Sequence, residues 1–108
     1  METKIERISC AAIWYKDLKL KKIIESNVLP VNCDKGLVFC GHRHPHCMYS
    51  MSSITGLRSV TTQVGEYIQG FLTTFNRFVD RKEGARIHVA NGGKLNYSSE
   101  TLYSEDLY

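Results

Sequence analysis

The sequence has 108 residues, of which 43% are hydrophobic and 23% charged, and 14 Lys and Arg against 11 Asp and Glu give a formal net charge of +3. This length and composition are typical of one folded domain and argue against a disordered chain. The slight positive charge argues against a binder of DNA or RNA polymers, which usually has a strongly basic face, but it is compatible with a small anionic ligand.

The amino-terminal part of the chain indicates a cytosolic protein. The segment METKIER is charged, and the apolar stretch at 8–15 that follows is too short for a signal-peptide core with its cleavage site, or for a membrane span. Without an export signal, a disulfide framework is the weaker interpretation of the cysteines. We therefore expect no membrane association and four free thiols, at Cys10, Cys33, Cys40 and Cys47.

The first 41 residues contain patterns of short strands. Residues 8–15 are rich in small, β-branched and aromatic side chains, which predicts a mostly buried strand. Residues 16–24 alternate charged and apolar side chains, which suggests a hairpin turn followed by a second, half-exposed strand. Turn-forming residues at 32–36 precede another short apolar strand at 36–41.

The middle of the chain predicts a helix and a further strand. Pro45 suits a first helical turn, and Gly56 suits the end of a helix. Between them, apolar residues follow helical spacing at Cys47, Met48, Met51 and Ile54. The segment 64–73 follows, in which Phe71 and its alternating neighbours indicate a strand with two unlike faces.

The last third of the chain contains the clearest helix signal. Asp80 and Glu83 have capping-box spacing, and the glycine pair at 92–93 ends the predicted helix. Phe78 would act as the hydrophobic staple of this helix. In the tail we expect Leu102, Tyr103, Leu107 and Tyr108 to pack while Ser104, Glu105 and Asp106 face water. These elements predict a single α+β domain spanning residues 1–108, with a small antiparallel sheet and two helices.

The stretch CGHRHPHC at 40–47 places three histidines and one arginine between two cysteines. Cysteine and histidine ligate zinc, but structural zinc sites usually take two ligands from a distant second pair, and only isolated cysteines remain for that role. The alternative is an anion site, in which free N–H groups at a helix start act together with Arg43 and nearby imidazoles such as His44. We favour fold support with anion contact, and we predict no bound metal or other cofactor.

Nucleophilic catalysis is a further alternative, because histidines flank Cys40 and Cys47 and could lower a thiol pKa. The sequence offers no evident third group to orient such a pair. It also contains no nucleophile elbow, P-loop or dinucleotide fingerprint. We therefore assign no catalytic residue.

A second group of functional residue types lies at 70–81, where aromatic side chains alternate with polar and charged ones. A ring such as Phe71 can stack on a purine, and Arg77 can bind a phosphate through its forked guanidinium. Asn76 and Asp80 can bond a ribose or the edge of a base. These are the components of a nucleotide pocket, and we consider Phe71 the best stacking candidate.

The segments CAAIWY, FCGHRHPHC, QGFLTTFNRFVDRKEGARI and LYSEDLY resemble a family of small phage proteins. Its members share a C-A-A-I strand, a G-x-R-H-x-x-C turn, a Q-G-F-x-T…R-F-V-x-R-x-E-A helix entry and an S-E-D-L-Y tail. The resemblance spans residues 10–108 and is identified with the first class of phage Thoeris anti-defence proteins.

This resemblance implies a non-enzymatic protein of the host cytoplasm that traps a cyclic ADP-ribose isomer made by a bacterial TIR-domain enzyme. Some relatives form dimers or larger assemblies and hold cyclic oligonucleotides at separate sites. By residue, the resemblance implies Phe71 as the stacking ring, Asp80 and Arg77 as polar groups, and Arg43 and His44 as phosphate contacts or fold supports. A chain of this size would enclose such a ligand between two protomers, so we expect a homodimer or a larger homo-oligomer.

The sequence also departs from the family pattern. Gly84 stands where a helix-favouring residue is usual, at a cost of up to about 1 kcal/mol relative to alanine. Asp80 stands where some relatives have asparagine, and a carboxylate would repel a diphosphate. Two other functions stay open at this point, namely a hydrolase that degrades the same nucleotide and a small zinc-binding interaction module.

Overall fold

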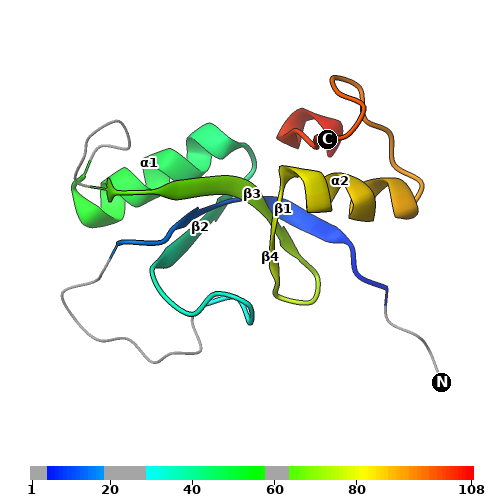
Figure 1. Cartoon of the computed structure of the whole chain (residues 1–108). Coiled ribbons are helices and arrows are strands. Elements are labelled where there is room, and N and C mark those ends of the chain that lie inside the picture. Colours follow the sequence, from blue (N-terminus) through cyan, green and yellow to red (C-terminus); the bar gives the residue numbers. More distant parts are fainter. Residues whose placement is uncertain (1–4, 19–28, 58–63) are drawn as a thin grey trace.

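The computed structural model describes residues 5–18, 29–57 and 64–108. These residues form one four-stranded antiparallel sheet with two α-helices, which confirms the predicted α+β fold class (Figure 1). The strand predicted at 16–24 lies largely outside the described residues, and its described part begins as a turn. None of the described helices is long and apolar enough to cross a bilayer.

The sheet has the strand order β2-β1-β3-β4, and every neighbouring pair is antiparallel. Its strands are β1 (Ile8–Tyr15), β2 (Leu37–Gly41), β3 (Tyr67–Thr73) and β4 (Phe78–Asp80). The first has the predicted bounds, and the next two lie within their predicted segments. The three-residue β4 was not predicted, because so short a strand leaves no alternating pattern to detect.

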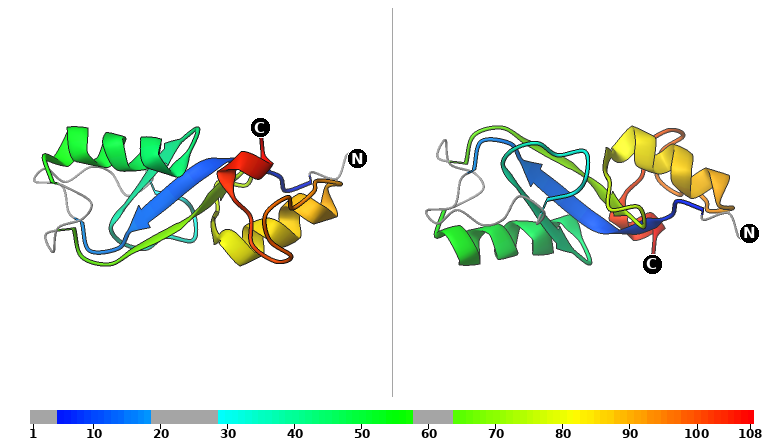
Figure 2. Two further views of the ribbon diagram at one scale, coloured as in Figure 1. Left: turned by 90° about the horizontal axis from the view of Figure 1, so that it is seen from above. Right: turned by 90° about the horizontal axis from the view of Figure 1, so that it is seen from below.

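Both helices cover the same face of the sheet. Helix α1 (His44–Thr55) contacts β2 and β1, whereas α2 (Arg81–Ala90) contacts β3 and β4 (Figure 2). The main core lies between these layers, and its buried members include Ala11, Ile13, Tyr15, Cys47, Met51, Phe71, Ala85 and Leu102. Alternation along β1 and β3 places Ala11, Ile13, Tyr15 and Phe71 on the side of the sheet that faces the helices, which confirms the two unlike faces predicted for β3.

The helix boundaries follow the predicted signals. Gly56 ends α1 in the left-handed conformation, with φ of 76°. Asp80 caps α2 by accepting a hydrogen bond of 2.8 Å from the Glu83 backbone N–H. The Glu83 side chain forms no reciprocal bond to the cap but binds Arg86 instead, so only half of the predicted capping box is present.

The opposite face of the sheet carries a smaller apolar cluster. Its buried members are Ala12, Cys33 and Phe78, and the Trp14 ring packs edge-on against Phe78 with centroids 5.8 Å apart. The prediction that Phe78 is the staple of α2 is therefore wrong. Because side chains alternate along β4, Val79 faces the helix layer and Phe78 faces away from it.

The carboxy-terminal tail ends in a short 3₁₀ helix, η3 (Ser104–Asp106), which lies between the first turns of α1 and α2 (Figures 1 and 2). Leu102 is buried as predicted, but Ser104 is buried too, at 2% exposure. Tyr103 and Tyr108 are exposed. The prediction that Ser104 faces water is wrong, because the tight turn directs its side chain inward. The two tyrosine rings are partly exposed, yet each packs on a neighbour, Tyr108 on His42 and Tyr103 on Arg81.

Candidate ligand-binding site

The histidines of the CGHRHPHC turn point to different neighbours. His44, only 5% exposed, lies 2.8 Å through Nε2 from the carbonyl oxygen of Gly70. Nδ1 of His46 accepts a hydrogen bond of 3.1 Å from the Arg43 backbone, which closes the start of α1. The His42 ring stacks on Tyr108 with centroids 4.3 Å apart. The turn is therefore built from capping, packing and stacking contacts.

Metal binding gains no support from this arrangement. Across the described ranges 5–18, 29–57 and 64–108, no three His, Cys, Asp or Glu side chains are grouped so that they could hold an ion. All four cysteines are free thiols, as predicted. The Cys47 thiol is fully buried beneath α1, and this burial raises its pKa to about 11.

Arg81, the first residue of α2, contacts three other parts of the chain. One terminal nitrogen donates to the Leu102 carbonyl at 3.0 Å, and the other donates to Gln69 at 2.6 Å and lies 3.4 Å from Nδ1 of His44. The guanidinium carbon lies 4.9 Å from the centroid of the Tyr103 ring. Arg81 thus joins α2, β3 and the start of α1 to the tail.

Arg43 holds the same tail from the other side. Its guanidinium donates to the Ser104 carbonyl at 2.8 Å and also to the Tyr108 carbonyl, and it lies 5.2 Å from the Tyr108 ring centroid. We call Arg43, His44 and Arg81 the arginine clamp. This clamp brings together the G-x-R-H turn, the R-x-E helix entry and the S-E-D-L-Y tail, which are far apart in the sequence.

The ion pairs between described residues involve Arg77 and Arg86, so the guanidinium of Arg81 has no ion-pair partner among them. The partners of Arg43 and Arg81 are mainly neutral carbonyl groups. Burial lowers the pKa of Arg81, and burial together with the nearby Arg81 charge lowers the pKa of His44. The site therefore combines a neutral imidazole with two cations, and Glu105 is the carboxylate close enough to favour charge on His44 and Arg81.

The clamp includes two of the predicted ligand residues, Arg43 and His44, but the other four lie elsewhere. Phe71 is in the core at 0% exposure, edge-on to His44 with centroids 5.2 Å apart. A purine cannot stack on a ring that has no exposed surface, so the structure does not support Phe71 as the stacking residue. Gly84 allows α2 to approach this ring, since a Cβ there would lie 3.0 Å from Phe71.

The remaining predicted residues lie on or near the β3–β4 hairpin. Asn76 occupies the turn with φ of 56°, and Arg77 binds Glu6 through two hydrogen bonds of 2.8 and 2.9 Å. Because of this ion pair, Arg77 has a role in the fold. The Asp80 carboxylate caps α2, and this structural role explains the residue without any contact to a ligand. The structure therefore does not bring the six predicted residues together.

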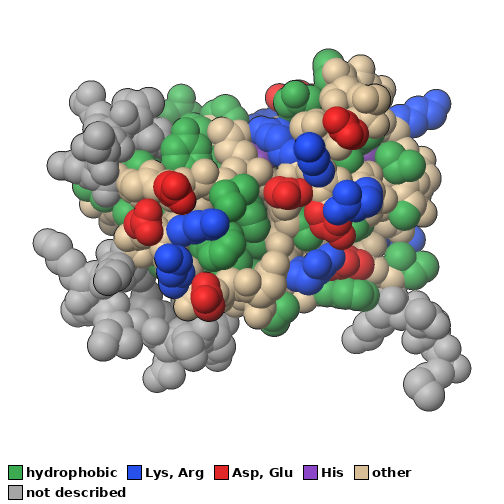
Figure 3. All heavy atoms as spheres, viewed as in Figure 1, with side chains coloured by type: hydrophobic (Ala, Val, Ile, Leu, Met, Phe, Trp, Pro, Cys, Tyr) green, Lys and Arg blue, Asp and Glu red, His purple; other side chains and the backbone are tan. Residues whose placement is uncertain are grey.

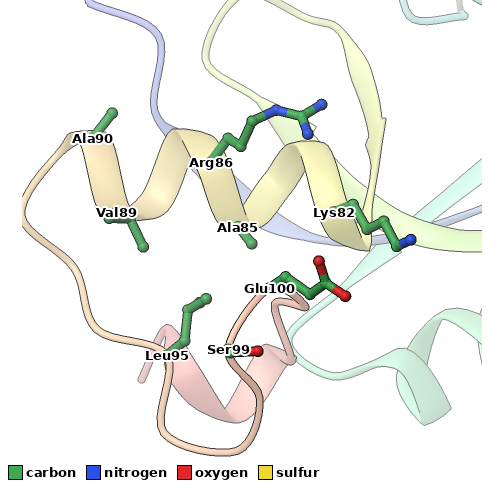
Figure 4. Close-up of a pocket in the computed structure, with 8 residues that line it drawn as sticks. All are labelled: Lys82, Ala85, Arg86, Val89, Ala90, Leu95, Ser99 and Glu100. Carbon is green, nitrogen blue, oxygen red and sulfur yellow. The ribbon is translucent and has the colours of Figure 1, made fainter.

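A hollow of about 520 Å³ lies beside α2, and we call it the α2 hollow (Figure 4). Its lining residues are Lys82, Ala85, Arg86, Val89, Ala90, Leu95, Ser99 and Glu100. Ala85 and Val89 project from the helix toward Leu95 on the facing loop. The Arg86 and Ala90 side chains point away from that loop, so the interior is mainly apolar with polar groups at its edge.

A second hollow, of about 430 Å³, is lined by Tyr97, Tyr103 and Glu105, and we call it the tyrosine hollow. The two rings meet edge to face with centroids 6.1 Å apart, and Tyr97 is 67% exposed. Arg81 contacts the Tyr103 ring, so this hollow adjoins the arginine clamp. Exposed aromatic faces next to a guanidinium are suited to stacking a planar base and binding an anion.

Residues 7–108 match the model of a family described as the phage T4 y16D protein. The chain belongs to this family. The match covers all the described strands and both helices, so the y16D family assignment includes the arginine clamp and both hollows. It confirms the predicted membership of a small phage protein family. No curated protein and no solved structure matched the chain.

Four residues of the arginine clamp's surroundings and the tyrosine hollow were not among the predicted site residues, namely Gln69, Arg81, Tyr97 and Tyr103. Gln69 and Arg81 belong to the Q-G-F and R-x-E motifs of the resemblance. Their polar side chains stand next to core residues in the sequence, and this position could have marked them as candidate site residues. No local pattern marks Tyr97 as exposed. The sequence places Tyr97 and Tyr103 six residues apart in a tail without periodicity, and only the folded loop brings their rings together.

Proposed function

We propose that this phage protein binds a cyclic ADP-ribose-type nucleotide in the cytoplasm of the infected bacterium and sequesters it without cleavage. Removal of such a messenger would block the immune signalling that depends on it, as in the Thoeris anti-defence proteins that the sequence resembles. The observation that carries this proposal is the exposed Tyr103 ring beside the Arg81 guanidinium, whose charge no described carboxylate pairs.

The tyrosine hollow offers the contacts that a nucleotide needs. Stacking of one base on an aromatic ring contributes about 1–3 kcal/mol and tolerates different bases. Tyr97 and Tyr103 supply two such rings, and Arg81 supplies donors for a phosphate. The Glu105 carboxylate would repel a phosphate but can accept hydrogen bonds from a ribose diol or an exocyclic amine. The pyrophosphate is therefore expected on the Arg81 side of the hollow.

Binding without cleavage is supported by the state of the residues that could react. His44 is buried and engaged with Gly70, and the Cys33 and Cys47 thiols are buried with their pKa values raised to about 11. The pKa of Cys10 is lowered to about 7, but Cys10 does not line either hollow. A nucleophile needs a lowered pKa and access to the ligand. In contrast, tight retention requires only stacking, charge and enclosure.

Both hollows are open to solvent on one protomer, so we propose that a second copy of the chain completes the enclosure. A homodimer would place a further wall over the exposed Tyr97 ring, which is 67% exposed in the single chain. Ligand enclosure by two protomers is common where one small domain lacks the depth to bury a dinucleotide. The proposed assembly is a homodimer or a larger homo-oligomer.

The proposal is tested by the thermal stability of the protein in the presence of cyclic ADP-ribose isomers. At a thousandfold excess of ligand over Kd, binding to the folded state adds about 4 kcal/mol to the free energy of unfolding, and the melting temperature rises accordingly. The variant Tyr103→Ala should lose most of this rise, because the stacking surface is removed.

Tyr49→Ala is the control, because Tyr49 is also an exposed tyrosine, at 69% against 36% for Tyr103, but lies on α1 and does not line the tyrosine hollow. This variant should keep the full rise in melting temperature. A wild-type protein whose melting temperature is unchanged by every isomer would contradict the proposal. An equal loss in both tyrosine variants would show that Tyr103 is not the stacking residue.

A further inference from the structure

Two of the free thiols, Cys10 on β1 and Cys40 on β2, lie on the same face of the sheet. In the antiparallel ladder Cys40 pairs directly with Ala12, and Cys10 precedes Ala12 by two residues. Ala12 belongs to the smaller apolar cluster on the face opposite the helices. Because side chains alternate along each strand and paired residues share a face, both cysteines project from that face too. They are diagonal neighbours on adjacent strands.

The two sulfur atoms are close enough to share a hydrogen bond, which the Cys40 thiol donates to the Cys10 sulfur. The pairing of β1 with β3 shifts its register between Ile8 and Cys10, and an irregularity of this kind bends a strand. Diagonal positions on neighbouring strands normally lie slightly too far apart for a disulfide. The bend at this end of β1 supplies the local adjustment that a covalent link between the two sulfurs requires.

The pair also has the access and the acid–base state of a reactive dithiol. Cys40 is exposed and Cys10 is half-buried, whereas Cys33 and Cys47 are buried. The hydrogen bond from Cys40, together with one from the Gly41 backbone, lowers the pKa of Cys10 to about 7, and the same contact raises the pKa of Cys40. This shift has a local cause, and the described side chains on the face seen in Figure 3 likewise show acidic and basic groups interspersed, not gathered into a positive patch.

We infer that Cys10 and Cys40 form a site of reversible two-electron oxidation, at which a hydroperoxide converts the two thiols into a disulfide. Redox-sensing cysteines combine an accessible thiolate with a second thiol beside it, and disulfides of cytosolic proteins are usually transient ones of this kind. The link would tie β1 to β2 and stabilise the folded chain by restricting the unfolded one. Neither residue lines the α2 hollow or the tyrosine hollow, so this inference is independent of the proposed nucleotide binding.

With hydrogen peroxide the reaction balances in two steps. The Cys10 thiolate attacks one peroxide oxygen, so that an S–O bond forms while the O–O bond breaks, and the departing hydroxide takes up the proton that Cys10 lost on ionisation. The sulfur of Cys10, now a sulfenic acid, has given two electrons to the peroxide. The Cys40 sulfur then attacks the Cys10 sulfur, the S–S bond forms as the S–O bond breaks, and the leaving hydroxide takes the Cys40 proton. Two thiols and one peroxide thus yield one disulfide and two water molecules.

The test is to treat the reduced protein, freed of reductant, with hydrogen peroxide at neutral pH, to cap the remaining thiols with iodoacetamide and to map the peptides by mass spectrometry. The Cys10 and Cys40 peptides should be joined, and each chain should lose the mass of two hydrogen atoms. Both thiols should disappear at least about tenfold faster than the buried thiol of Cys33. Dithiothreitol should restore them, and the oxidised protein should melt at a higher temperature than the reduced one.

Two variants separate the pair from the other thiols. In Cys40→Ala the second thiol is missing, so Cys10 should stop at the sulfenic acid, which dimedone traps as a stable adduct. Cys33→Ala makes the same change outside the pair and should still form the disulfide. Because Cys40 is exposed, Cys40→Ala should melt close to the reduced wild type, which excludes misfolding as the cause of a lost link.

Three results would overturn the inference. The first is that Cys10 and Cys40 can both still be alkylated after peroxide treatment, although the protein is folded. The second is a disulfide that joins Cys10 to Cys33 or Cys47. The third is a link that joins two chains in place of two strands of one chain, which a non-reducing gel would reveal as a covalent dimer.

Discussion

The imidazole of His44 lies between Gly70 and Arg81, with Nε2 at 2.8 Å from the Gly70 carbonyl oxygen and Nδ1 at 3.4 Å from the Arg81 guanidinium. The carbonyl can only accept and the guanidinium can only donate, so this geometry requires the neutral tautomer with hydrogen on Nε2. Burial and the Arg81 charge lower the pKa of His44, which agrees with that tautomer. The arginine clamp is therefore built around an uncharged histidine.

This relationship predicts that the protein loses stability in mild acid. The pKa of His44 is lower in the folded state than the value of about 6.5 in the unfolded chain, so the unfolded state binds the proton more readily. The free energy of unfolding should be constant above about pH 7.5 as far as His44 is concerned, and should fall as the pH drops through 6.5. Urea unfolding at pH 7.5 and 5.5 measures the difference.

His44→Gln is the informative variant, because an amide can donate to Gly70 and accept from Arg81 but does not titrate. This variant should lose much of the decrease in stability between pH 7.5 and 5.5. The carboxylates Glu6 and Asp106 have lowered pKa values and stay ionised over that range, so they do not contribute to the decrease. An identical decrease in the wild type and in His44→Gln would contradict the neutral tautomer.

A second prediction concerns the attachment of the tail. Replacement of Arg81 by methionine keeps the apolar stem but removes the donors to Leu102 and Gln69, and should lower the free energy of unfolding by about 2–3 kcal/mol. Arg81→Lys should not restore it, because one ammonium cannot span both acceptors. Arg86→Met, on the same helix but with its side chain 71% exposed, should change stability by less than about 0.5 kcal/mol.

Hydrogen exchange gives a local test of the same attachment. The Leu102 amide donates to the Arg81 backbone carbonyl at 3.0 Å and should be protected in the wild type. In Arg81→Met its exchange should accelerate more than that of the Phe71 amide in the centre of β3, because the tail opens before the sheet. Uniform acceleration of both amides would mean that the tail is not separately held.

A third prediction separates the two roles considered for Phe71. As a fully buried core residue, its replacement by leucine should cost about 1 kcal/mol or more of stability. The affinity for nucleotide, measured well below the melting temperature, should stay at the wild-type value because the ligand never touches the ring. A folded Phe71→Leu protein with strongly reduced affinity would restore Phe71 as a ligand residue.

A fourth prediction concerns the thiols of Cys10 and Cys40, which lie on adjacent strands. A hydrogen bond from Cys40 lowers the pKa of Cys10 to about 7, whereas burial raises the pKa of Cys33 and of Cys47 to about 11. At pH 7.5, iodoacetamide should therefore modify Cys10 well before the two buried thiols, as mass spectrometry of peptides would show. Cys40→Ala removes the donor and should slow modification of Cys10 at this pH.

Much of the fold could be predicted from the sequence because the relevant signals are local. The strand at Ile8–Tyr15, the Gly56 end of α1 and the Asp80 cap of α2 depend on residues within a few positions of each other. The two faces of β3 were also predicted. The sequence does not show on which face of the sheet the two helices pack. Because the helices cover the face that carries Phe71, this residue lies in the core.

The candidate site was harder to predict, because it depends on contacts across the whole chain. In the arginine clamp, Arg43 binds Tyr108 and Arg81 binds Gln69. The spacing of these residues along the sequence does not show that they are in contact. Tyr103 was expected to pack because it is a large aromatic residue in an apolar tail. In the structure the 3₁₀ turn of η3 directs Ser104 inward and leaves the Tyr103 ring partly exposed beside Arg81, so the proposed stacking surface depends on the folded tail.

The central claim is that the protein retains a cyclic nucleotide and leaves it chemically intact. The most direct measurement is to incubate the purified protein with a cyclic ADP-ribose isomer, remove free ligand by gel filtration, denature the protein by heat and chromatograph the supernatant. The account predicts recovery of the unchanged cyclic compound in a fixed ratio to protein. Recovery of a linear product would show an enzyme instead, and recovery of no nucleotide at all would contradict the claim.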